Sequence, residues 1–143
     1  MIVGHLALVT SAVFTGAAFY INAVEQPARL ALRDDAALEQ WKTSYGRGIV
    51  MQGTLAIVGA LLGAIAFAGN RDWHWLAGAV MMLANWPYTL IGIMPTNRTL
   101  MATPQAEAGP STRRLIANWG QLHMVRTGLG ALSTLVFLWA AAA

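Results

Sequence analysis

The chain has 143 residues, of which 57% are hydrophobic and only 10% are charged, with a formal net charge of +3. Soluble domains usually carry about 25% charged residues, so this composition excludes an ordinary soluble globular domain. The chain contains no cysteine, which excludes disulfides, iron–sulfur ligation and a thiol nucleophile.

Four segments are apolar and long enough to cross a bilayer: residues 2–24, 49–69, 73–94 and 122–143. A helix needs about 20 such residues to cross about 30 Å of hydrocarbon. The first segment lacks the basic start of a secretory signal and exceeds its usual apolar length, so we interpret it as a span. The sequence therefore predicts one all-α membrane domain, a four-transmembrane-helix bundle.

The first helix is expected to end near Glu25, because Pro27 lacks a backbone donor and disfavours a helical residue before it. Residues 36–45 have an amphipathic pattern that predicts a short interfacial helix between the first and second spans. Its aromatic residues, Trp41 and Tyr45, suit the level of the lipid headgroups.

In the second span, Gly59 and Gly63 have the Gly-x3-Gly spacing that allows another helix to approach closely. The third span is expected to kink at Pro87 and to end at the segment that contains Pro95. A last helix is expected to begin near Ser111 and to continue into the membrane.

Basic residues are concentrated in two connections, residues 25–48 and 95–121, whereas only Arg71 lies in the connection between the second and third spans. The positive-inside rule makes the two basic connections cytoplasmic and both termini exterior. We therefore expect an integral protein of a bacterial inner membrane, with the lipid bilayer and not nucleic acid as its partner.

Trp119, His123 and Arg126 are spaced i, i+4 and i+7, which places them on one face at the start of the last span. Arg126 either snorkels to the headgroups or pairs with an acid inside the bundle. Glu25 is the natural acid, although it can instead pair with Arg29 four residues away. His123 is the side chain at this end that titrates near neutral pH.

Further polar residues, including Tyr20 and Asn97, fall at the same end of the predicted bundle. They predict one polar cavity that opens toward the cytoplasm between the first, third and last helices. Trp86 and Tyr88 are either packing residues or part of a substrate pocket.

Metal ligation has weak support from the sequence. His123 has no His, Asp or Glu three or four residues away on its helix, so no metal ligand set is predicted. His5 and His74, together with Met81 or Met82, leave a copper or bis-histidine haem site open on the exterior side.

Three segments carry a family resemblance: Tyr20–Leu30, Met94–Arg98 and Trp119–Gly130. Together they resemble a small integral-membrane family whose best-known members are fungal anthrone oxygenases. The resemblance implies a four-helix membrane protein which, in the anthrone-oxidising members, adds dioxygen to an electron-rich aromatic without an evident metal or flavin. We accordingly predict no cofactor.

Such a reaction needs a base for an acidic C–H proton, a cation or hydrogen-bond donor for the resulting oxyanion, and an apolar pocket. On this resemblance, His123 would be the base, and Arg126 and Asn97 would bind the oxyanion. The candidate substrate-binding residues are Trp119, Trp86, Tyr88, Tyr20 and Glu25.

The leading hypothesis is therefore a membrane oxidoreductase that acts on a small hydrophobic aromatic or quinone-like compound. The first alternative is a non-catalytic membrane subunit or ligand-binding module, in which the polar cluster holds helices together. The second alternative is a small proton-coupled transporter that uses His123 and Glu25. Four helices would then need a homo-oligomer to surround a path.

Overall fold

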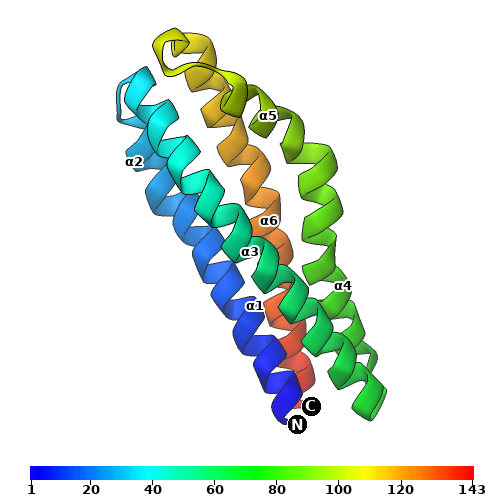
Figure 1. Cartoon of the computed structure of the whole chain (residues 1–143). Helices are drawn as coiled ribbons and strands as arrows, with labels where there is room; N and C mark the ends of the chain where they lie inside the picture. Colours follow the sequence, from blue (N-terminus) through cyan, green and yellow to red (C-terminus); the bar gives the residue numbers. More distant parts are fainter.

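The computed structural model describes residues 1–143 as four long helical rods that pack side by side (Figure 1). The first rod comprises α1 (Ile2–Tyr20), the π-helical turn η1 (Ile21–Glu25) and α2 (Gln26–Leu30); the second is α3 (Asp34–Asn70). The third comprises α4 (Trp73–Tyr88), the π-helical turn η2 (Thr89–Ile93) and α5 (Met94–Ala102). The short 3₁₀ turn η3 (Gln105–Glu107) leads to the last rod, α6 (Pro110–Ala142).

All four rods are long and apolar enough to cross a membrane, which confirms the predicted all-helical membrane bundle. The two termini lie together at one end of the bundle, and the connections from α2 to α3 and from α5 to α6 lie at the other end (Figure 1). The polar residues singled out in the sequence belong to the half of the bundle near these two connections.

Two rods continue past the points where the sequence predicted an end. The first rod runs through Pro27, and the third runs through Pro95. In both cases a π-helical turn comes directly before the proline region, with a backbone N–H bonded five residues back, from Gln26 to Ile21 and from Met94 to Thr89. The wider turn changes which carbonyl each N–H bonds just before the proline, which itself has no N–H. The helix can therefore continue through the proline.

Residues 36–45 are helical, as predicted, but they continue into the second span without a break as the start of α3. Trp41 is fully buried inside the bundle, and it stacks on Tyr45 with ring centroids 4.8 Å apart. The reason is that the neighbouring rods also extend beyond the spans, so Ile116 and Trp119 of α6 cover this segment.

The buried apolar side chains form two clusters. The cluster on the side of the termini is densely filled and includes Phe14, Trp75, Met82 and Phe137. The cluster at the other end includes Trp41, Ile93, Leu100, Ile116 and Trp119.

Glycines let the rods approach closely in the dense cluster. A Cβ on Gly63 would lie 2.7 Å from Phe137, and a Cβ on Gly59 would lie 3.0 Å from Met82, which confirms that this glycine pair serves close packing. On α6, a Cβ on Gly130 would lie 2.7 Å from Phe14.

Gly130→Ala should therefore destabilise the bundle by about 1–3 kcal/mol, because the added Cβ would force the fully buried Phe14 ring to shift. Gly128→Ala is the matched control, because a Cβ there meets nothing within 4 Å. Thermal unfolding in detergent, followed by near-ultraviolet circular dichroism, measures both. Equal stability of the two variants would contradict the close approach of α1 and α6.

Candidate functional site

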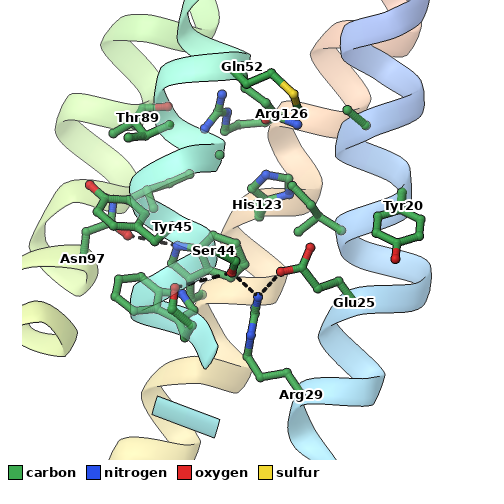
Figure 2. A pocket seen from close by; sticks show the side chains of 18 residues that line it. Tyr20, Glu25, Arg29, Ser44, Tyr45, Gln52, Thr89, Asn97, His123 and Arg126 are labelled. Atoms are coloured by element: carbon green, nitrogen blue, oxygen red, sulfur yellow. Dashed lines mark hydrogen bonds and ion pairs between the residues drawn. The ribbon is translucent and has the colours of Figure 1, made fainter. Parts of the chain in front are cut away.

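A cavity of about 270 Å³ lies inside the bundle, in the half away from the termini (Figure 2). All four rods contribute to its wall, and α3 contributes more residues than any other element. The sequence placed the cavity between the first, third and last helices, so the contribution of α3 was missed. The labelled lining residues are Tyr20, Glu25, Arg29, Ser44, Tyr45, Gln52, Thr89, Asn97, His123 and Arg126.

Six of the eight candidate site residues line this cavity: Tyr20, Glu25, Asn97, Trp119, His123 and Arg126. The other two lie elsewhere. Trp86 is 39% exposed and donates its indole N–H to the backbone oxygen of Gly53 at 3.2 Å. Tyr88 donates its hydroxyl to the backbone oxygen of Leu122 at 2.8 Å. Both side chains therefore join helices in this structure.

His123 lies near the middle of the cavity and is almost fully buried (Figure 2). Its ring stacks on Trp119, with centroids 5.0 Å apart. Nδ1 lies 2.9 Å from Oδ1 of Asn22, whereas Nε2 makes no hydrogen bond. A neutral imidazole in this position offers Nε2 to a ligand in the cavity.

Arg126 is a buried cation, only 7% exposed, and no carboxylate lies within salt-bridge distance of it. It neither snorkels nor pairs with Glu25, the two outcomes that the sequence left open. Its guanidinium carbon lies 5.7 Å from the centre of the Phe14 ring, and its Nε has no hydrogen-bond partner. A buried cation without an acid is costly, so this position favours an anionic or oxygen-bearing ligand.

Two further donors in the cavity wall are buried without a partner: Nε2 of Gln52 and Nε1 of Trp41. Figure 2 shows Gln52 and Arg126 toward one end of the cavity and Glu25 and Arg29 toward the other end. The groups of this wall that are buried without a partner are thus hydrogen-bond donors, whereas Nε2 of His123 is an unpaired acceptor. The donors suit a ligand that carries oxygen acceptors.

Glu25 pairs with Arg29, its Oε1 lying 2.5 Å from Nη2 of the guanidinium. Arg29 is 2% exposed and also donates to Gln26 at 2.6 Å and to Ser44 at 2.9 Å. The structure therefore decides the alternative in favour of the local i, i+4 pair. The carboxylate of Glu25 is used to satisfy Arg29 and does not compensate Arg126.

Asn97 joins two aromatic side chains of the cavity wall, Trp119 and Tyr45, by hydrogen bonds. Trp119 donates its indole N–H to Oδ1 of Asn97 at 2.9 Å, and Nδ2 of Asn97 donates to the hydroxyl of Tyr45 at 3.3 Å. Both ends of the carboxamide are therefore occupied. The Tyr45 hydroxyl accepts a hydrogen bond from Asn97, so its own O–H remains free to donate to a ligand.

Sequence reasoning missed the α3 wall, although its periodicity was available. Trp41, Tyr45, Ile49 and Gln52 recur at helical spacing on one face, but a break drawn between an interfacial helix and the second span divided the pattern. An unbroken helix from Asp34 onward would have shown it.

No group of three or more His, Cys, Asp or Glu side chains is placed to hold a metal ion. His5 is exposed, and His74 is engaged in capping α4, with its Nδ1 2.6 Å from Oδ1 of Asp72. The backbone and ring N–H groups of His74 lower the pKa of Asp72 below its ordinary value. The copper or bis-histidine haem arrangement of His5 and His74 needs fewer than three such ligands and stays a prediction.

The fold and the site together define a small four-helix membrane protein with a donor-rich cavity inside its bundle. The sequence profile of the anthrone oxygenase family matches residues 41–136, and the chain belongs to this family. No solved structure matches the chain.

Two fungal relatives support an oxygenase-like role. The chain is 28% identical over 138 residues to "Anthrone oxygenase" of Claviceps purpurea, which covers 86% of this chain and 79% of the relative. It is 28% identical over 131 residues to "Anthrone oxygenase tpcL" of Aspergillus fumigatus, which covers 85% of this chain and 81% of the relative. These relatives confirm the family resemblance, but they give no support to a bacterial inner membrane.

A double-mutant cycle should find that Glu25 is coupled to Arg29 and not to Arg126. We expect an interaction free energy of about 1–3 kcal/mol between Glu25→Gln and Arg29→Met, because removal of the acid leaves a buried cation unpaired. With Arg126→Met, the coupling should stay within about 0.5 kcal/mol. Chemical unfolding in detergent measures both cycles, and a larger coupling to Arg126 would contradict the observed pairing.

Proposed function

We propose that this protein is a membrane oxygenase that binds an electron-rich, hydroxylated polycyclic aromatic of the anthrone type in the cavity and oxidises it with dioxygen. The observation that carries the proposal is the buried Arg126, which has no acid partner and shares the cavity wall with a second unpaired donor, Gln52. The names of both relatives point to the same substrate class.

The proposed overall reaction balances with dioxygen as the sole oxidant. The anthrone methylene carbon loses two C–H bonds and gains a C=O bond, and one oxygen atom of dioxygen becomes that carbonyl. The other oxygen atom leaves as water with the two hydrogens. The first step is loss of a C–H proton from the methylene carbon, which places a negative charge on the carbonyl oxygen across the central ring.

In this proposal, Nε2 of His123 takes the proton, a role that contributes about 10²–10⁴-fold in known general-base catalysis. The guanidinium of Arg126 stabilises the oxyanion, with Gln52 as a second donor. The stacked Trp41 and Tyr45 rings, together with Trp119, provide flat walls for a planar substrate. The role of Asn97 is to hold Trp119 and Tyr45 in place, which replaces the oxyanion contact expected from the sequence.

We also propose a membrane orientation. Seven of the nine Lys and Arg residues lie within residues 25–48 and 95–121, which include the connections from α2 to α3 and from α5 to α6 and the helix ends beside them. The positive-inside rule would place that end of the bundle in the cytoplasm and both termini on the exterior side. Tyr20 and Met51 line the cavity and are about half exposed on the outside of the bundle, at 55% and 49%. A hydrophobic substrate would enter between them from the bilayer.

Arg126→Met should lower turnover by about 100-fold or more while leaving stability unchanged or raised by up to about 4 kcal/mol, because it replaces an unpaired buried cation with an apolar side chain. His123→Gln should lower turnover by about 10²-fold or more. The assay follows anthrone absorbance and dioxygen uptake by purified protein in nanodiscs, together with thermal unfolding.

Trp86→Phe is the control, because this residue lies outside the cavity and should retain turnover. Full activity in both the Arg126 and His123 variants would overturn the proposed mechanism. If Arg126→Met instead unfolds the bundle and the wild-type protein consumes no dioxygen, the polar cluster has a structural role in a non-catalytic subunit.

A further inference from the structure

Asn22 lies in η1 and is half-buried, and its side chain forms hydrogen bonds with three residues on one face of α6. Its side chain contacts Gly120, His123 and Thr127, which are spaced i, i+3 and i+7. One helical turn further along the first rod, Gln26 donates to the backbone oxygen of Ile116 at 2.7 Å. Two carboxamides from one rod thus anchor the same face of α6.

The orientation of the Asn22 amide follows from chemistry. One end of the amide lies 2.8 Å from the backbone oxygen of Gly120, which can only accept a hydrogen bond. The group at that end must therefore be Nδ2, the donor. Oδ1 consequently faces the other way, toward His123 and Thr127.

The tautomer of His123 follows from the same logic. Oδ1 of Asn22 lies 2.9 Å from Nδ1 of His123 and 2.8 Å from the hydroxyl of Thr127. Because this oxygen can only accept, Nδ1 must carry a proton and the hydroxyl must donate. In a neutral imidazole one nitrogen is a donor and the other is an acceptor, so Nε2 holds the free lone pair.

We infer that Asn22 is a positioning residue that fixes His123 as the Nδ1–H tautomer and thereby presents Nε2 to the cavity as the proton acceptor. The inference rests on the proposed function for its catalytic consequence, but the tautomer itself rests on geometry alone. Free imidazole side chains favour the opposite, Nε2–H form. Without Asn22 the nitrogen that should accept the substrate proton would therefore be blocked.

The local fold explains why Asn22 can reach this position. Gly120 has no side chain to hold the first rod away from α6, since a Cβ there would lie 2.6 Å from Nε2 of Gln26. The π-helical turn widens the first rod where Asn22 projects toward α6. Close approach and backbone widening together place the amide against His123.

The test is nitrogen-15 NMR of histidine-labelled protein in detergent at neutral pH, in a His5→Gln, His74→Gln background in which His123 is the sole histidine. Wild-type His123 should show a protonated Nδ1 and an unprotonated Nε2. Asn22→Leu should shift the ring toward the Nε2–H form. Thr127→Val is the matched control, because it removes the other donor to Oδ1 and should leave the tautomer unchanged.

An Nε2–H or doubly protonated ring in the protein with native Asn22 overturns the inference, and this measurement does not depend on whether Asn22→Leu folds. Retention of the Nδ1–H form in folded Asn22→Leu also overturns it. For turnover, Asn22→Leu should lower kcat about tenfold or more with little change in KM, whereas Thr127→Val should not. If the tautomer shifts as expected but His123→Gln remains active, the proposed function fails and the tautomer assignment stands.

Discussion

The site depends on one physical constraint, a guanidinium buried among apolar helices without an acid. Arg126 lies over the Phe14 ring, and no carboxylate lies within salt-bridge distance of it, so no acidic side chain neutralises it. The nearest suitable carboxylate, Glu25, is already committed to Arg29. Natural bundles can replace a buried charge with a methionine or leucine at little cost. The proposed binding of an oxyanion rests on this unpaired charge.

The backbone is irregular at the places where the cavity needs room. Both π-helical turns, η1 and η2, lie at the level of the cavity, and both come just before a proline. A proline alone would kink or end a helix, but a widened turn before it lets the rod continue and moves neighbouring side chains around the axis. The first and third rods are therefore regular in the dense half and irregular in the hollow half, whereas α3 and α6 are unbroken in both. This division follows from the positions of Pro27 and Pro95.

The features that depend on composition and helical spacing, such as the four spans, could be predicted from the sequence. The choice of partner for a charged side chain could not. Hydropathy and length were enough for four spans, and helical spacing placed Trp119, His123 and Arg126 on one face. The partner of Glu25 could not be chosen, because a local pair and an interhelical pair both satisfy the same charges. Trp86 shows the same limit: it lies close in sequence to the cavity residue Thr89, and only the rotation of the rod turns it outward.

Phe14 connects the two halves of the molecule and shows how stability and function are balanced. On one side its ring fills the space that Gly130 leaves on α6, and on the other side it forms a cation–π contact with Arg126. Such a contact is worth up to about 2 kcal/mol when it is desolvated, which offsets only part of the cost of the buried charge. The dense cluster therefore contacts Arg126 through the Phe14 ring but does not neutralise its charge. That incomplete compensation leaves the charge of Arg126 unpaired in the cavity wall, because a carboxylate in the same place would pair with it and occupy the site.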